Sequence, residues 1–196
     1  MVAVQHERDG RSRILSTARD LFATRGFHQT SMAQLAAAAQ VSVGQIYRLF
    51  KGKEDIIEAL VKADSDAWAT DMAALRSQLD AGAMSIEQTF EQILLHGTDN
   101  ANDEALSFDI LAEAFRNEAV GETIGTLCVG FRSILREFAC VANPELSGEA
   151  LDAAEELILA CMFGLGHRSL SRPKLSAPIA ARRAAQMIIA GLKAVR

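Results

Sequence analysis

The stretch from Ser31 to Phe50, SMAQLAAAAQVSVGQIYRLF, constrains the fold of this chain more than any other segment. It predicts two short helices joined by a tight turn. The first begins at Met32 and consists almost entirely of good helix formers, and Ser31 can cap it with Gln34 completing a capping box. Ser42 is a second possible cap. Apolar residues let the two helices close on each other, at Leu35, Ala36, Val41, Ile46 and Phe50.

A polar face on the second helix completes the pattern of a helix-turn-helix, in which the second helix enters the major groove of DNA. Here that face carries Gly44, Gln45, Tyr47 and Arg48. An alanine-rich helix followed by an amphipathic one also occurs in many helical domains that bind no DNA. On the pattern alone, both interpretations stay open.

Charge is distributed unevenly along the 196 residues. The formal net charge is −5, but residues 1–55 hold eight Lys/Arg against five Asp/Glu, a balance of +3. The remainder holds twelve against twenty, a balance of −8. Attraction to phosphate depends on charge within about 8–10 Å. A basic N-terminal part on an acidic remainder therefore fits DNA binding at one end only.

Motifs for catalysis and metal binding are missing from the sequence. It contains no P-loop, GxGxxG or HExxH motif, and neither His96 nor His167 has a neighbouring Ser or Cys with an acid. The carboxylates of Glu104, Asp109 and Glu113 share a helix face, which we interpret as an acidic, solvated surface. We expect no catalytic residues, no metal and no cofactor.

Cysteine usage and hydropathy favour a cytoplasmic protein. Cys128, Cys140 and Cys161 are an odd number of widely spaced residues without metal-binding spacing, and the sequence has no signal peptide. We expect them to be buried, reduced thiols. No apolar run approaches the roughly 20 residues of a membrane span.

A further helix is predicted before the helix-turn-helix. From Ser12 onward an apolar stripe predicts a helix that ends at Gly26, and this helix would form the third wall of a small core. Residues 1–10 are polar and are expected to be frayed. The residues of the stripe are Ile14, Leu15, Ala18, Leu21 and Phe22.

Several linked motifs carry a family resemblance between Ile14 and Leu60. They are Arg25-Gly26-Phe27, Thr30-Ser31, Val41-Ser42-x-Gly44-x-Ile46-Tyr47-x-x-Phe50 and Lys53-Glu54. With this spacing the segment resembles the N-terminal domain of TetR-type (TetR/AcrR) transcriptional regulators. The resemblance implies an all-α fold of about nine helices. It also implies a three-helix DNA-binding domain at residues 8–55, with the helix-turn-helix at 31–50, and a helical ligand-binding and dimerisation domain at residues 56–196.

The function implied by the resemblance is that of a homodimeric repressor, which a small-molecule effector releases from its double-stranded DNA operator. A helical adaptor that binds proteins and recognises no operator is the alternative. The chain also departs from the family pattern, since Ala33 and Leu49 replace frequent DNA-contacting residue types. These departures suggest an operator preference that depends more on DNA shape.

Eight residues are the predicted DNA contacts. Helix N-termini bind phosphate through unpaired N–H groups, which favours the helix starts at Ser31, Ser42 and Lys53. Gly44 lets the backbone approach the duplex, and the Tyr47 hydroxyl can reach a phosphate. Gln45 could pair with adenine, Arg48 with guanine, and Val43 could touch a thymine methyl group. The alternatives are phosphate contacts for Gln45 and Arg48, a half-buried aromatic at Tyr47, and a solvated lysine at Lys53.

Helical patterns continue through the rest of the chain. A helix of about 40 Å is expected from Lys53 to about Leu79. Further helices are expected near 85–96, 106–115, 122–141, 147–170 and 179–195, with a polar break at Gly97–Asn102. In the family the last two long helices, here about 147–171 and 179–195, pack against their mates in a dimer. The alternative is packing within one chain.

An effector pocket is implied by the same resemblance. Its candidate lining residues lie on several helices that should enclose the body, and ordinary core packing is the alternative for each of them. The chemistry of the effector cannot be read from these residues. They are Trp68, Met72, Phe90, His96, Phe108, Phe115, Met162 and Phe163.

Overall fold

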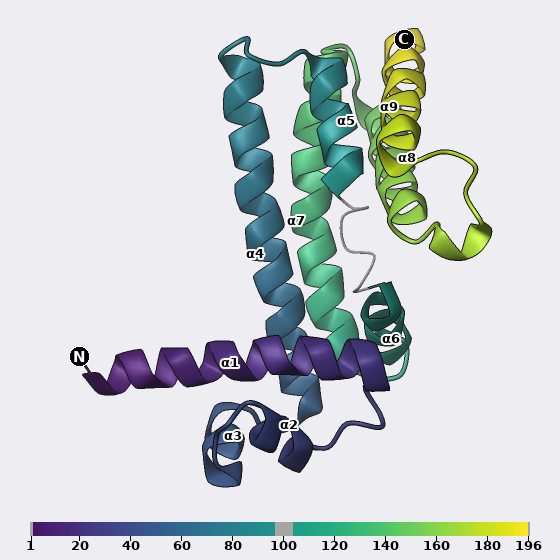
Figure 1. Cartoon of the computed structure of the whole chain (residues 1–196). Helices are drawn as coiled ribbons and strands as arrows, with labels where there is room; N and C mark the ends of the chain where they lie inside the picture. Colours follow the sequence, from purple (N-terminus) through teal and green to yellow (C-terminus); the bar gives the residue numbers. More distant parts are fainter. Residues whose placement is uncertain (1, 97–103, 196) are drawn as a thin grey trace. The chain divides into compact units, whose positions relative to one another are not determined.

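The computed structural model describes residues 2–96 and 104–195, and the fold of these residues is all-α, as predicted (Figure 1). They form nine α-helices and one short 3-10 helix at Ser169–Ser171, without a strand. The predicted break at Gly97–Asn102 lies outside the described residues. The helices are α1 (Val2–Arg25), α2 (Met32–Ala38), α3 (Val43–Leu49), α4 (Lys53–Asp80), α5 (Ile86–His96), α6 (Glu104–Ala114), α7 (Glu118–Ala142), α8 (Gly148–Gly166) and α9 (Ala177–Ala194).

Contacts divide the chain into two compact units. The head unit comprises residues 1–65 and 102–126, and the body unit comprises residues 66–101 and 127–196. Helices α4 and α7 each run from one unit into the other. The head unit thus continues past residue 55, where the sequence predicts the end of the DNA-binding domain. That domain boundary stays a prediction.

One hydrophobic core holds the head unit together. The α1 residues Ile14, Ala18 and Phe22 are fully buried, and they recur every four residues on one helix face. Phe27 follows the α1 C-terminus, where Gly26 adopts the predicted left-handed conformation (φ 86°), and its ring packs edge-on against Phe22. The other buried members include Leu35, Ile46, Ile57, Leu106 and Val120 from α2, α3, α4, α6 and α7.

The body unit has a second core, formed by α5, α8, α9 and the parts of α4 and α7 that lie in this unit. Trp68 of α4 packs edge-on against Phe131 of α7, with 4.5 Å between ring centroids. Asn143 follows α7 and donates hydrogen bonds to the carbonyl oxygens of Leu192 (2.8 Å) and Val195 (3.0 Å). This buried amide therefore satisfies carbonyl groups at the C-terminus of α9.

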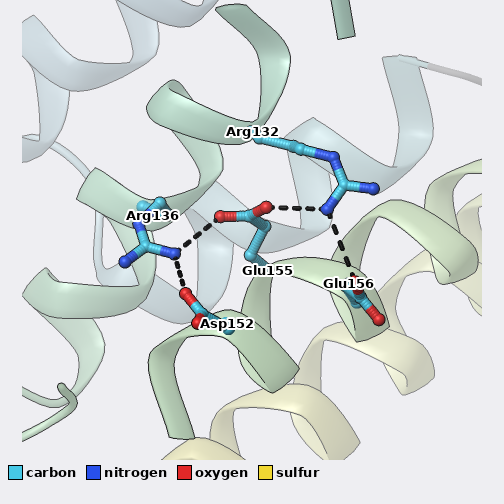
Figure 2. A network of polar contacts seen from close by, with 5 residues as sticks. All are labelled: Arg132, Arg136, Asp152, Glu155 and Glu156. Carbon is cyan, nitrogen blue, oxygen red and sulfur yellow. Dashed lines mark hydrogen bonds and ion pairs between the residues drawn. The ribbon is translucent and has the colours of Figure 1, made fainter. Parts of the chain in front are cut away.

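An ionic network joins α7 to α8 in the body unit (Figure 2). The buried carboxylate of Glu155 accepts hydrogen bonds from Arg132 (2.7 Å) and Arg136 (2.9 Å). These bonds, that from Arg132 first, lower the pKa of Glu155 below its ordinary value. Arg136 also pairs with Asp152, and Arg132 lies 3.7 Å from Glu156. Charged groups thus supplement apolar packing between these helices.

Several helix ends differ from the prediction. Helix α1 begins at Val2, ten residues before the start predicted at Ser12, and the fraying expected for residues 1–10 stays a prediction. Helix α7 begins four residues early, because the Asn117 side chain accepts the N–H groups at its start. Helix α8 ends at Gly166 and not near residue 170, because His167 leaves the helical conformation (φ −114°, ψ 25°).

Helix α9 begins at Ala177, two residues before the start predicted at Ile179, with Pro178 in its first turn, where a missing N–H costs nothing. The three cysteines are free and partly buried, and burial raises the pKa of the Cys161 thiol. Among the described residues, no helix has the length and hydropathy that a membrane crossing requires.

Candidate nucleic-acid interface

Helix α2 is fixed at its start by the predicted capping box. The Ser31 hydroxyl accepts the N–H of Gln34 (3.2 Å), and the Gln34 side chain accepts the N–H of Ser31 (2.8 Å). Both bonds lie within four residues of one another in the chain, so the motif depends on local sequence alone.

The turn between α2 and α3 is closed by a Schellman motif. Gln40 adopts a left-handed conformation (φ 54°), the N–H of Val41 donates to the carbonyl of Ala36, and that of Gln40 donates to Ala37. Ser42 then caps α3 by accepting the N–H of Gln45 (3.1 Å), as predicted. Backbone and cap together set the direction in which α3 leaves the turn.

Helix α3 separates a buried side from an exposed side. Ile46 is fully buried, whereas Val43 and Tyr47 are 50% and 53% exposed. Gly44 and Arg48 are exposed as well. The exposed apolar and aromatic side chains of Val43 and Tyr47 form a surface that a binding partner can cover.

Gln45 is placed differently from its neighbours on α3. Its side chain is only partly exposed, and its carboxamide lies against Gly10 of α1. The predicted reader of adenine is therefore in contact with another helix of the head unit.

Lys53 is engaged with the connection between α1 and α2. Its ammonium group donates hydrogen bonds to the carbonyl oxygens of Phe27 (2.6 Å) and His28 (3.4 Å), and it lies 4.5 Å from the centre of the Phe27 ring. It is thus not a freely solvated lysine. A phosphate contact by this group would have to exchange or share these bonds, and that contact stays a prediction.

Carboxylates surround the start of α4. Glu54 and Asp55 lie in its first turn, and Asp55 accepts the N–H of Lys51 (2.8 Å). Negative charge at a helix N-terminus stabilises the helix and reduces its attraction for a phosphate. Phosphate contacts at the N-termini of α2, α3 and α4 all stay predictions, and of these three ends the α4 N-terminus has acidic residues in its first turn.

Two α6 carboxylates, which the sequence interpretation assigned to a solvated surface, contact the α1–α2 connection. Asp109 accepts the N–H of Phe27 (3.0 Å), and Glu113 lies 3.5 Å from the imidazole of His28. Glu113 is buried, so the prediction of a solvated face was wrong for this residue. The N–H groups that follow a helix end need acceptors, but the sequence does not indicate which distant helix supplies them.

The predicted effector-pocket residues fall into separate places. Trp68, Met72 and Phe90 share the core of the body unit, and Met162 packs against that core. His96 lies 3.6 Å from Asp71 of α4.

The remaining three do not join that core. Phe163 is half exposed and stacks on His167. Phe108 and Phe115 belong to the head unit, where they are 39% and 93% exposed. The lining of an effector pocket by these eight residues stays a prediction.

A groove of about 490 Å³ opens on the surface of the body unit between α4, α7 and α8. None of the predicted effector-pocket residues lines it. Its lining consists of Arg76, Ser133, Arg136, Glu137, Cys140, Val141 and Leu151.

Comparison with known proteins places the helix-turn-helix in a described family. Residues 14–60 match the family model for bacterial regulatory proteins of the tetR family. The HTH-type transcriptional regulator UidR of Escherichia coli (strain K12) is 31% identical over 110 residues, which cover 56% of this chain and 54% of UidR. The aligned region thus spans about half the length of the curated relatives that the chain matches.

Solved structures share the fold over nearly the whole chain. Salmonella enterica GusR has a TM-score of 0.69 and 25% sequence identity, with 94% of this chain and 95% of GusR covered. The transcriptional regulator FadR from Bacillus subtilis, determined in complex with stearoyl-CoA, has a TM-score of 0.70 and 17% identity, with 92% and 98% covered. At 17% identity, the second likeness concerns the fold alone.

Proposed function

The chain belongs to the TetR family of bacterial regulatory proteins, and from this premise we propose that it binds DNA and regulates transcription. The observation that carries the proposal is the exposed side of α3, capped by Ser42 and aimed by the turn at Gln40. This side offers a half-exposed Tyr47 and Val43 beside the exposed Gly44. A methyl group added to Gly44 would have the Ser42 hydroxyl, at 4.0 Å, as its nearest neighbour beyond the adjacent residues and the α3 backbone. A short helix with an open backbone and a hydroxyl group suits the major groove.

Phosphate contacts would position this helix. Ser31 and Ser42 cap α2 and α3, whose first N–H groups would bind phosphate oxygens, and the Tyr47 hydroxyl would donate a hydrogen bond to a further phosphate. Val43, Gln45 and Arg48 would contact base edges. Lys53 would add a phosphate contact only where DNA competes with the carbonyl groups that it binds in the free protein.

A homodimer would present two such helices to a two-fold operator. Helices α8 and α9 support it, because each exposes large apolar side chains that a second copy could cover. On α8 these are Leu157 (53% exposed) and Phe163 (49%), and on α9 they are Ile179 (49%) and Met187 (75%). Two-fold symmetry would set the half-site spacing near one helical turn of DNA, or a multiple of it.

An effector that binds the body unit would act as the inducer of this repressor. If Trp68, Met72, Phe90 and Met162, which lie in or against the body core, line its pocket as predicted, the effector is an apolar ligand or one with an apolar part. B. subtilis FadR, with the same fold, binds stearoyl-CoA. No chemical group of the effector is specified by these residues.

Catalysis is not part of the proposal, since the matched relative is a transcriptional regulator. A regulator of bacterial transcription works where the chromosome lies, which is the cytoplasm. Under the rival hypothesis of a protein-binding adaptor, the same exposed α3 surface would contact a protein.

Selection of bound sites from random double-stranded DNA tests the proposal. The purified protein should enrich a palindromic sequence, and its affinity for that sequence should fall steeply as salt is raised. Failure to enrich any sequence, with binding that is absent or insensitive to salt, would exclude the regulator and favour the adaptor.

A further inference from the structure

Gly10 extends the buried side of α1 towards its N-terminus. It is buried, and it precedes Ile14, Ala18 and Phe22 at intervals of four residues, on the helix face that packs in the head core. Glycine is a poor residue for the interior of a helix, because it loses the most backbone freedom on folding. A glycine at this position therefore calls for an explanation in the packing.

Contact with Gln45 of α3 supplies that explanation. A methyl group added to Gly10 would lie 2.8 Å from Nε2 of Gln45 and 3.9 Å from its Cδ, and real side chains essentially never approach closer than 3.0 Å. The carboxamide of Gln45 thus occupies the space that a larger residue would fill. Val43 and Tyr47, two positions away on either side, extend into solvent instead.

We propose that Gly10 is a positioning residue for sequence recognition: because it has no side chain, the Gln45 carboxamide packs against α1, and it reads a base pair from this position. The proposal rests on the proposed function, since it concerns how α3 distinguishes DNA sequences. It assigns a role in specificity to a residue of α1 that lies outside the helix-turn-helix.

The chemistry of the carboxamide explains why its orientation matters. A glutamine pairs with adenine through one donor and one acceptor in the same plane, and both must be aligned with N7 and N6 of the base. A side chain held against α1 has fewer rotamers to lose when it binds. A methyl group at position 10 displaces the amide, and because only the end of a flexible side chain must move, the fold is retained.

A double-mutant cycle tests the proposal. Gly10→Ala, Gln45→Ala and the double variant are compared with the wild type by selection from random DNA, followed by titration of sites that differ at single base pairs. One base contact supplies roughly 5- to 150-fold discrimination. We expect G10A to reduce this discrimination at least about threefold, at the same base pair that Q45A affects. The double variant should discriminate between base pairs as Q45A does.

Controls separate positioning from a general effect on the head unit. Ser16→Ala, on the exposed side of α1, makes a similar change away from Gln45 and should preserve the base preference. Affinity for unrelated DNA should stay within about twofold of wild type in all variants, because phosphate contacts are unchanged. A wild-type preference in G10A would overturn the proposal, as would a double variant that differs from Q45A.

Nuclear magnetic resonance distinguishes failure of this proposal from failure of the proposed function. The side-chain amide resonance of Gln45, assigned by its loss in Q45A, should shift in G10A and stay in place in S16A, without any DNA present. An unshifted resonance overturns the contact itself. If the wild type binds no DNA, the recognition role falls with the proposed function, and the spectrum still decides the contact.

Discussion

At the scale of single residues, the predicted DNA-contacting groups of α3 and α4 differ in what they contact within the head unit. Tyr47 is 53% exposed and extends from the helix, whereas Lys53 and Gln45 are engaged with other parts of the head unit. The position of each group on its helix was predictable from spacing. The contacts of Lys53 and Gln45 were not, because their partners Phe27 and Gly10 lie 26 and 35 residues away in the sequence.

Replacing Tyr47 with Phe removes a hydroxyl group and leaves the ring. If the hydroxyl binds a phosphate, affinity should fall about 2- to 10-fold for every DNA sequence, the loss expected for one hydrogen bond. The slope of affinity against salt should be unchanged, since no charge is removed. Fluorescence anisotropy with selected and unrelated duplexes measures both. A loss confined to the selected sequence would instead indicate a base contact.

Glu155 gives the body unit a pH-dependent contribution to stability. Hydrogen bonds from Arg132 and Arg136 lower its pKa in the folded protein, so the unfolded state binds the proton more tightly. The stabilisation is therefore complete above the unfolded pKa of about 4.3 and is lost as pH falls through the lower, folded value. Glu155→Gln should lower the melting temperature by about 2–4 °C at neutral pH.

The difference between E155Q and the wild type should shrink as pH falls below the unfolded pKa of about 4.3, because the unfolded state binds the proton first and the folded carboxyl binds it only at lower pH. Glu156→Gln is the matched control, because Glu156 is 72% exposed and its carboxylate lies 3.7 Å from Arg132, too far for a hydrogen bond. This substitution should shift the melting temperature little. Scanning calorimetry from pH 3 to pH 7 measures both variants. An E155Q difference that stays constant over this range would contradict the assignment.

At the scale of helices, features that depend on neighbouring residues were predicted correctly, and a contact between residues far apart in the sequence was missed. The caps of α2 and α3 depend on residues three positions apart, so Ser31-x-x-Gln34 and Ser42 were sufficient. The end of α8 was misplaced because the apolar pattern continues through Leu170. The role of α6 was missed because Asp109 binds the N–H of Phe27 across 82 residues.

The bond between Asp109 and Phe27 should stabilise the head unit. Asp109→Ala leaves the Phe27 N–H without its acceptor and should lower the free energy of unfolding by about 1–2 kcal/mol. Asp109→Asn keeps an acceptor oxygen and should recover most of this loss. Urea denaturation measures both variants. Equal destabilisation by the two substitutions would show that the charge of Asp109, and not its hydrogen bond to Phe27, stabilises the head unit.

At the scale of the whole molecule, exposed apolar side chains on α8 and α9 predict a dimer. Met187 is 75% exposed on α9, and a charge at this position would have to be buried against the partner. Met187→Glu should therefore weaken dimerisation by roughly 100-fold or more, which corresponds to about 3 kcal/mol. Val129→Glu is the control, because Val129 of α7 is also exposed (67%) but lies outside the predicted interface.

Analytical ultracentrifugation distinguishes the 21.1 kDa protomer from a particle of twice that mass. The wild type and V129E should sediment as dimers at micromolar concentration, and M187E should sediment as a monomer. Because a two-fold operator is held by both heads at once, M187E should also lose most of its affinity for a full palindrome. Its affinity for a single half-site should match that of the wild type. A dimeric M187E, or a V129E that dissociates equally, would place the interface on another surface.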